Sequence, residues 1–239
     1  MQISFKDKVV LVAGGTGGLG HAVSLAFLSE GAKVIVTYRN EKGLASLKSA
    51  AGAQASAIDA VETDVTEEAG GTRLIEGILA KHGRLDVLVN TVGGYAGGVN
   101  LCETDAKTFD RMLDLNLRSG FVLARAAVPA MLKQGSGAVV NVAAKAAVDH
   151  GAGASAYAAS KAAAVAMMDS LAADVKGTGV RVNSVLPSII DTPVNRQAMP
   201  DANFAVWPKP EEIARVILFL ASDAAQVING AQIPVYGKS

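Results

Sequence analysis

The sequence predicts an α/β fold built around a doubly wound parallel sheet of about seven strands. Short β-branched runs recur along the 239 residues with helical stretches between them, which is the pattern of parallel strands joined by crossover helices. The runs are apolar throughout, as expected for strands that helices cover on both faces. No repeat or low-complexity linker interrupts this order, so a single domain over residues 1–239 is the simplest interpretation.

The expected elements follow one another from the N-terminus. The β-branched runs place strands at residues 9–13, 33–36, 55–58, 87–90, 138–142, 181–186 and 232–235. Apolar spacing of helical period places helices at residues 18–30, 41–51, 67–81, 105–132, 155–175 and 210–221. Glycine- and proline-rich connections lie at residues 93–98, 135–137 and 187–210. Ligands bind at the carboxyl ends of strands in such sheets, so the first and last connections are the expected walls of a site, with a substrate loop near 187–210.

The composition favours a small-molecule partner. Lysine plus arginine and aspartate plus glutamate number 22 each, so no net charge would attract nucleic acid or an anionic membrane. Cys102 is the only cysteine, which excludes an internal disulfide and suits a reducing compartment. The three histidines, His21, His82 and His150, lie far apart in the sequence and predict no metal site.

Two features of the sequence favour a cytoplasmic protein. Residues 1–8 carry charge and lack the apolar stretch and small-residue cleavage site of a signal peptide. No apolar run approaches the roughly 18 residues that a membrane helix requires. We therefore expect neither a secreted protein nor a membrane partner.

The strongest local signal is a glycine-rich turn between the first strand and the first helix. Residues 9–13 run directly into Gly14, and Gly18 and Gly20 follow as the helix begins. Glycine at these positions leaves room for a tight turn, for phosphate against the backbone and for close helix–strand packing. The turn predicts a Rossmann-type pyrophosphate site, and its alternative is a flexible turn without a ligand. The expected contacts are Gly14, Thr16, Gly18, Leu19 and Gly20.

The end of the second strand bears on the choice of nicotinamide cofactor. Residues 37–40 read Thr-Tyr-Arg-Asn, with no acid to accept hydrogen bonds from an adenosine ribose 2′-hydroxyl. Arg39 instead offers a planar cation able to grip a 2′-phosphate, although a solvated surface arginine is the alternative. The residues therefore predict that NADP(H) is preferred and leave NAD(H) open.

A tyrosine and a lysine four residues apart lie in the expected helix at 155–175. Tyr157 and Lys161 project from one face of that helix. A tyrosine with its ordinary pKa of about 10 is a poor acid–base group at neutral pH, and a neighbouring ammonium group is expected to lower the pKa of Tyr157. The two residues predict an acid–base pair, with an ordinary surface pair as the alternative.

The glycine spacing and the Tyr-x-x-x-Lys pattern resemble the short-chain dehydrogenase/reductase family along the whole chain. Two further segments are similar to that family, Asn90-Thr91-Val92-Gly93 and the Leu-Asn-Leu triplet around Asn116. The resemblance implies that Tyr157 is the proton donor, that Lys161 binds the ribose, and that Asn116 anchors a water linked to the lysine. Either asparagine is otherwise a local partner of the backbone.

The same resemblance implies further cofactor contacts. Asp64 falls where the family has an aspartate that contacts adenine, and its alternative role is that of a helix N-cap. The implied contacts beyond the glycine turn and Arg39 are Asp64, Val65, Asn90, Gly93, Tyr157, Lys161, Pro187, Ile190 and Thr192.

One position departs from the family pattern. Thirteen residues before Tyr157, where the family has the serine that holds a substrate carbonyl, the sequence has Ala144. Ser155 is near in sequence, but two residues from Tyr157 on a helix it is expected to point to a different side. The missing hydroxyl counts against ordinary ketone or alcohol chemistry.

The quinonoid dihydropteridine reductases are a branch of this family that also lacks the serine. The resemblance to this branch implies an electron-poor ring as substrate, which needs less polarisation than a ketone to accept hydride. Tyr95, where the branch has a tryptophan, is expected to stack on a flat substrate near Ala144, or else to be a loop aromatic that closes over the core. Arg39 departs from the branch, which favours NADH. The similar stretches are residues 93–98, 144–149, 185–187, 191–196 and 199–204, together with Trp207.

Three functions therefore stay open. The first is reduction of a pterin-like or quinone-like ring. The second is a general carbonyl reductase or alcohol dehydrogenase in which water or backbone replaces the serine. The third is a non-catalytic nucleotide-binding sensor, against which the retained Asn116, Tyr157 and Lys161 argue.

Two helices predict self-association. The expected helices at 105–132 and 155–175 are apolar and alanine-rich on more than one face, which leaves apolar surface that the sheet cannot cover. In the family these helices pair across a two-fold axis. We therefore expect a homodimer or a homotetramer.

Overall fold

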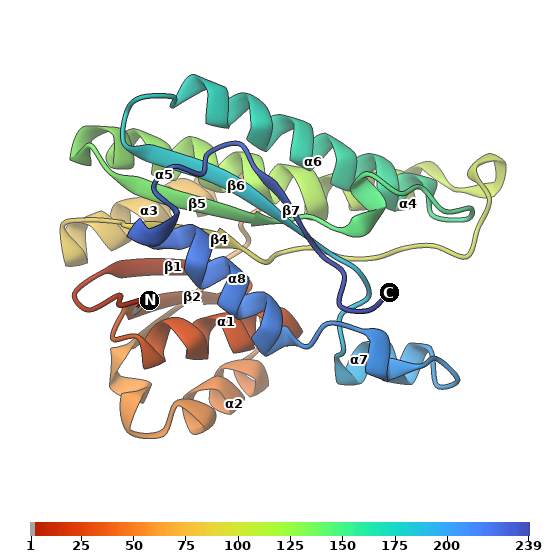
Figure 1. Ribbon diagram of the computed structural model, residues 1–239, viewed down its shortest axis with the longest axis horizontal. Helices are drawn as coiled ribbons and strands as arrows, with labels where there is room; N and C mark the ends of the chain where they lie inside the picture. The colour runs from red at the N-terminus through yellow and green to blue at the C-terminus, as the bar shows by residue number, and fades with distance from the viewer. Residues whose placement is uncertain (1–2) are drawn as a thin grey trace.

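Seven parallel strands form one sheet in the order β3-β2-β1-β4-β5-β6-β7 (Figure 1). The computed structural model describes residues 3–239, and Met1 and Gln2, at the start of the predicted domain, lie outside the described residues. The strand order reverses between β1 and β4, the switch point at which such sheets bind ligands. The predicted doubly wound fold is confirmed. The strands are β1 (Val9–Ala13), β2 (Lys33–Tyr38), β3 (Ile58–Glu62), β4 (Val87–Asn90), β5 (Gly137–Val142), β6 (Val180–Pro187) and β7 (Gln232–Val235).

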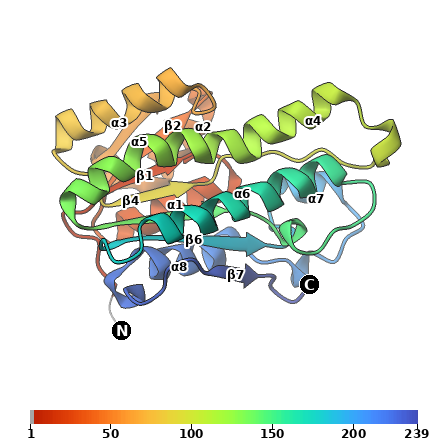
Figure 2. The ribbon, with the colours of Figure 1, turned by 90° about the horizontal axis from the view of Figure 1, so that it is seen from above.

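Helices cover both faces of the sheet (Figures 1 and 2). In β1, Val10 and Val12 belong to the core under α1, α2 and α8, whereas Leu11 belongs to the core under α3, α5 and α6. Burial on both faces is why the strand reads as an unbroken apolar run. No helix among residues 3–239 is long and apolar enough to cross a membrane. The helices are α1 (Gly18–Ser29), α2 (Glu41–Ala51), α3 (Glu68–His82), α4 (Ala106–Leu113), α5 (Ser119–Gln134), α6 (Ser155–Asp174), α7 (Pro193–Ala198) and α8 (Pro210–Ala221).

The third strand begins later than predicted. Residues 55–58 were expected to form it, but Gly52–Ala57 wind into a 3₁₀ helix and β3 runs from Ile58 to Glu62. β3 is an edge strand that carries Asp59, which pairs with Lys81 and His82 at 2.6 and 2.8 Å. A search for apolar runs misses such a half-polar edge strand.

The long helix expected at 105–132 is three segments. A π-helical stretch, Asp114–Arg118, separates α4 from α5, and Asn116 lies within it. One extra residue in a turn changes the face on which the following side chains lie, and such π turns often occur at functional sites. The short helix α7, inside the predicted loop at 187–210, was also not predicted.

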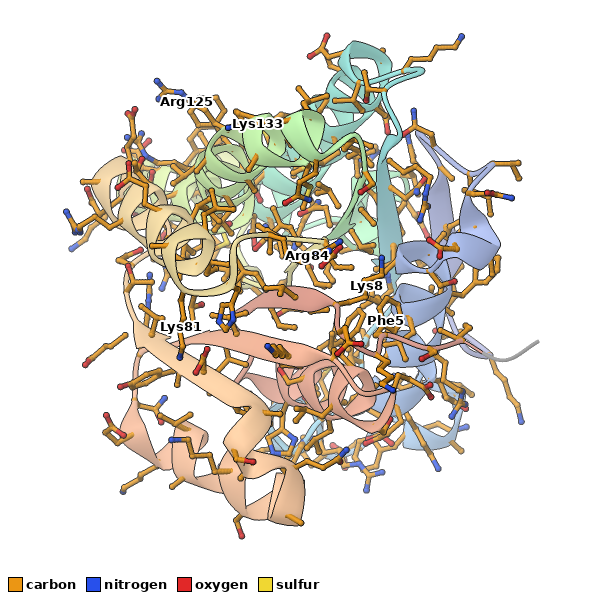
Figure 3. The ribbon with its side chains drawn as sticks, turned by 90° about the vertical axis from the view of Figure 1, so that its left-hand side faces the viewer. Phe5, Lys8, Lys81, Arg84, Arg125 and Lys133 are labelled. Atoms are coloured by element: carbon orange, nitrogen blue, oxygen red, sulfur yellow. The ribbon has the colours of Figure 1, made fainter. Side chains whose placement is uncertain are left out.

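Charged side chains lie at the amino-terminal ends of β1 and β4 (Figure 3). Asp86, which is buried, accepts a hydrogen bond from the Val9 N–H at 2.9 Å and pairs with Arg84 at 2.5 Å and with Lys8 at 3.7 Å. These contacts join the starts of β1 and β4. The opposite, carboxyl-terminal ends of the strands are where such sheets bind ligands.

Candidate active site

The glycine turn joins β1 to α1 as predicted. Gly14 has a φ of 75°, a conformation that favours glycine, and its N–H donates to Thr37 Oγ1 at 2.8 Å. Gly20 leaves no room for a side chain, since an added Cβ would lie 2.1 Å from the Gly14 carbonyl oxygen. α1 begins at Gly18 without a side-chain cap, so its first N–H groups are free to bind an anion. This cradle fits the pyrophosphate of a dinucleotide.

The loop after β6 closes over the start of α1. A Cβ on Gly18 would lie 3.1 Å from Thr192 Cγ2. Thr192 caps α7 by accepting the Asn195 N–H at 3.2 Å, and the Asn195 amide donates to the Ile190 carbonyl at 2.8 Å. Pro187 ends β6 at the root of this loop. Thr192 thus faces the glycine turn, with Ile190 and Pro187 in the segment that leads to it.

Two more of the predicted contacts lie around the turn. Thr16 is next to the start of α2, because a Cβ on Gly43 would lie 3.3 Å from Thr16 Oγ1. The Leu19 side chain is buried in the core, so its expected contact with a cofactor reduces to its backbone N–H.

Arg39 and Asp64 form an ion pair at the ends of β2 and β3. Arg39 Nη2 lies 2.8 Å from Asp64 Oδ1, and about half of each side chain is exposed. The pair leaves most of the guanidinium donors free. Asp64 also accepts the Thr66 N–H at 2.9 Å, whereas α3 begins at Glu68, so Asp64 closes a turn and is not the helix N-cap that was its alternative role. Val65, beside it, is buried.

The Asn90 side chain makes its hydrogen bonds to other residues of the chain. Asn90 is buried; its amide donates to Asn141 Oδ1 at 3.1 Å and its Oδ1 accepts the Val92 N–H at 3.2 Å. The side chain therefore shapes the start of the loop after β4, and a cofactor contact would fall to the Asn90 backbone. Gly93 lies against two of the predicted catalytic residues, because a Cβ there would be 2.8 Å from Asn116 Oδ1 and 3.2 Å from Lys161 Nζ.

Asn116 clamps the loop that follows β4. Its Oδ1 accepts the Gly94 N–H at 2.9 Å, and its Nδ2 donates to the Gly94 carbonyl and to Ser160 Oγ, both at 3.0 Å. These bonds use both amide hydrogens, so the water that the family resemblance implies would have to donate to an oxygen of Asn116. The bonds to Gly94 fix the loop after β4 against the π turn.

Tyr157 and Lys161 lie in α6, and the pKa of Tyr157 shifts in the direction opposite to the prediction. Burial raises the pKa of Tyr157 to about 12, with a smaller contribution from Tyr95. Burial lowers the pKa of Lys161 to about 8. Lys161 Nζ donates to the Val142 carbonyl at 3.0 Å. The expected lowering of the tyrosine pKa is wrong because burial removes water from the phenol, and Lys161 makes no opposing contribution.

Tyr95 packs against Tyr157. The two ring centroids are 5.0 Å apart and the rings cross at 76°. Ala144 is buried two residues after the end of β5 and carries no hydroxyl, as the sequence indicated. The Ser155 hydroxyl is also buried and has no hydrogen-bond partner within the described chain.

Two polar residues of the site were not predicted. Ser160 Oγ donates to the Tyr157 carbonyl at 2.7 Å and accepts from Asn116, so it links α6 to the π turn. Thr37 holds the glycine turn through Gly14. A signal existed in each case: Ser160 is a lone hydroxyl three residues after Tyr157, and Thr37 is the first polar residue after the apolar run of β2.

A doubly wound sheet with a glycine turn after β1, and with a half-buried tyrosine and a buried lysine four residues apart on α6, is typical of a nucleotide-dependent oxidoreductase. The family model described as short chain dehydrogenase matches residues 8–203, and the chain belongs to that family and is an oxidoreductase.

Known proteins resemble the chain over nearly its full length. A relative from Thermotoga maritima, 3-oxoacyl-[acyl-carrier-protein] reductase FabG, is 34% identical, with 97% of each chain covered. The structure of a short-chain type dehydrogenase/reductase from Mycobacterium ulcerans has a TM-score of 0.92 at 30% identity, covering 99% of this chain and 90% of that one. ElxO with NADP bound has a TM-score of 0.91 at 26% identity, covering 96% and 97%. The resemblance to quinonoid dihydropteridine reductase finds no support in these matches and stays a prediction.

Proposed function

We propose that the protein is an NADP(H)-dependent oxidoreductase that interconverts a carbonyl group and an alcohol by hydride transfer. The observation that carries the proposal is the placement of Lys161 and Asn116 against Gly93, in the loop after β4 that also contacts Gly14 of the glycine turn at the switch point of the sheet. The Thermotoga maritima relative is named for the reduction of a 3-oxo group, which is a ketone.

NADPH supplies the hydride when bound, and the residues of the chain do the rest. The glycine turn and the start of α1 bind the pyrophosphate. Tyr157, protonated at neutral pH like any tyrosine and held so to higher pH by its raised pKa, gives its proton to the carbonyl oxygen as hydride reaches the carbonyl carbon. Lys161, an ammonium group below its pKa of about 8, stabilises the phenolate that remains. Asn116 and Ser160 hold these groups in place.

The rate of carbonyl reduction is expected to fall as the pH rises through about 8. The pKa of Lys161 is lowered by burial to about 8, so the ammonium form is present below that pH and lost above it, and with it the charge that stabilises the Tyr157 phenolate. The measurement is kcat/KM between about pH 6 and 10, which reports the free enzyme. A profile that stays flat to pH 9.5 would show that the charge of Lys161 is not needed.

The preference for NADP(H) rests on Arg39. The end of β2 has no acidic residue. Arg39, just after β2, is held by its ion pair with Asp64, and most of its N–H donors are free. A planar guanidinium suits a 2′-phosphate. ElxO, of similar fold, is a protein with NADP bound. Adenine is proposed to lie near Asp64 and Val65, which follow β3.

Arg39→Ala is expected to weaken NADPH binding about 10- to 100-fold and to leave NADH binding nearly unchanged, because only the 2′-phosphate loses a charge-assisted contact. Fluorescence titration with both cofactors measures this. Arg73→Ala, on the exposed side of α3, is the control. An unchanged ratio of the two dissociation constants would exclude Arg39 as the reader of the phosphate.

A second candidate function is reduction of a pterin-like or quinone-like ring. Ala144 favours it, because a ring nitrogen has no developing alkoxide for a hydroxyl at that position to stabilise, and Tyr95 provides an aromatic wall near Tyr157. A non-catalytic sensor is the weaker alternative, since a protein that only binds nucleotide needs no proton donor.

One assay separates these functions. The protein is supplied with NADPH or NADH and with ethyl acetoacetate, 9,10-phenanthrenequinone or quinonoid dihydropterin. Reduction of ethyl acetoacetate supports the first candidate, and turnover of the quinone or the pterin without reduction of ethyl acetoacetate supports the second. If the protein transfers hydride to none of the three substrates, the result supports a non-catalytic sensor.

We infer that the protein forms a homodimer or a homotetramer through α4, α5 and α6. Phe109, Phe121 and Leu132 are exposed on α4 and α5, and a groove between α5 and α6 is lined by apolar residues that include Met167 and Leu171. Helices α5 and α6 lie side by side in Figures 1 and 2. Self-association would bury this face.

Sedimentation at about 10 μM is expected to show a dimer or tetramer, since a symmetric contact buries the apolar face twice. Phe121→Arg is expected to shift the protein to a monomer, because it places a charge in that contact. A wild-type protein that sediments only as a monomer would contradict the inference.

We also place the protein in the cytoplasm. Cys102 is free and exposed, a state that a reducing compartment preserves.

A further inference from the structure

The structure leaves the substrate oxygen with one evident donor. Tyr157 gives its proton to that oxygen, and the position from which the family directs a second hydroxyl is the buried methyl group of Ala144. An oxygen that gains negative charge in a desolvated site is stabilised by a second hydrogen bond. A carbonyl reductase of this form therefore needs its second donor from elsewhere.

Tyr95 is held where it can supply that donor. Its ring centroid lies 5.0 Å from that of Tyr157, and its hydroxyl makes no hydrogen bond within residues 3–239. The hydroxyl is close enough to Tyr157 that a charge on Tyr95 contributes to the raised pKa of Tyr157. The side chain is 66% exposed, so one side of it is open to a substrate.

The loop that carries Tyr95 is fixed at both ends. On one side, Asn116 clamps both polar groups of Gly94. On the other side, the N–H groups of Gly98 and Val99 donate to the Gly153 carbonyl at 2.8 and 3.3 Å. A loop pinned in this way presents its side chain in a set position.

Glycine at position 97 makes room for the tyrosine. A Cβ on Gly97 would lie 2.1 Å from the Tyr95 hydroxyl and 2.5 Å from the ring carbon that bears it. The end of the phenol that bears the hydroxyl therefore lies against the Gly97 backbone.

We propose that the Tyr95 hydroxyl takes the place of the missing serine and donates a hydrogen bond to the substrate oxygen during carbonyl reduction. In this step hydride bonds to the carbonyl carbon, the C=O π electrons move to oxygen, and oxygen takes the proton of Tyr157. Tyr95 keeps its own proton and stabilises the developing charge. This inference rests on the proposed function and adds a catalytic residue to it.

The test removes one hydroxyl and then restores another. Tyr95→Phe keeps the ring and is expected to lower kcat/KM for the carbonyl probe that the wild type reduces fastest by about 10- to 100-fold, without changing the dissociation constant of NADPH. Ala144→Ser added to Tyr95→Phe is expected to recover most of that loss, whereas Ala144→Ser alone gains less than about threefold because the donor is already present. Tyr236→Phe, at the same end of the sheet, is the control and is expected to stay within about twofold of wild type.

A second readout does not depend on turnover. Ultraviolet titration of the free protein is expected to show a lower pKa for Tyr157 in Tyr95→Phe, because the contribution of Tyr95 to its raised pKa is gone. An unchanged pKa would place the Tyr95 hydroxyl too far from Tyr157 for the proposed role.

Three outcomes would overturn the inference. Tyr95→Phe with full activity, when Tyr157→Phe is impaired, would leave the proposed function standing and remove Tyr95 from it. A gain of tenfold or more from Ala144→Ser alone would show that the second donor position is vacant. Loss of activity in Ser155→Ala but not in Tyr95→Phe would assign the role to the buried Ser155 hydroxyl. Full activity of Tyr157→Phe would instead contradict the proposed function itself.

Discussion

Tyr157→Phe is expected to lower kcat for carbonyl reduction by about 10²- to 10⁴-fold, the usual contribution of a positioned general acid. The change removes the proton that neutralises the alkoxide and keeps the ring that packs against Tyr95. Among the described residues the Tyr157 hydroxyl makes no hydrogen bond, and Ser160 binds only its backbone carbonyl. The fold and the affinity for NADPH should therefore change little.

The size of this effect also separates the two candidate functions. An electron-poor quinonoid ring accepts hydride readily and can take its proton from water, so with such a substrate Tyr157→Phe should slow turnover only in part. The measurement is the single-turnover rate with saturating NADPH, together with thermal unfolding. A variant that unfolds at the wild-type temperature and retains its rate with ketones would remove Tyr157 from the chemistry.

The fold could be predicted from the sequence because each central strand is buried on both faces and is therefore apolar along most of its length. β1, β2, β4 and β5 lie between two helical layers and read as apolar runs. The edge strand β3 mixes Asp59 and Glu62 with apolar residues, so a rule based on apolar runs places it too early. The π turn at Asp114–Arg118 escaped prediction because periodicity over a long helix does not resolve one inserted residue.

The geometry of the candidate site was predictable where it depends on spacing and not where it depends on burial. Gly14, Gly18 and Gly20 allow close approaches of the backbone, so their positions in the sequence predict the turn. The pKa of Tyr157 depends on how much water the folded chain removes from it, which no local pattern records.

The contacts between residues far apart in the chain could likewise not be predicted from the sequence. The hydrogen bonds of Asn116 to Gly94 join residues 22 apart in the chain, and the Arg39–Asp64 pair joins two strand ends. Each becomes visible only when the strands are in register.

Gly20→Ala is expected to raise the dissociation constant of NADPH about 100-fold or more. The added Cβ would lie 2.1 Å from the Gly14 carbonyl oxygen and 2.8 Å from Thr91 Oγ1, so either α1 must move away from the turn or the Gly14 peptide must rotate. Either change displaces the N–H donors that face the pyrophosphate, and the loss of two charge-assisted bonds accounts for a change of this size. Overpacking should also lower the free energy of unfolding by about 1–3 kcal/mol.

Gly77→Ala is the matched control, because Gly77 is exposed in α3 and a Cβ there meets nothing within 4 Å. Its helix propensity should raise the free energy of unfolding by about 0.5–1 kcal/mol without any effect on cofactor binding. Fluorescence titration with NADPH and urea unfolding of both variants measure the two effects separately. If Gly20→Ala binds NADPH within threefold of wild type while Gly77→Ala behaves as expected, the turn tolerates a side chain at that position and does not hold the pyrophosphate through the close approach of α1 to Gly14.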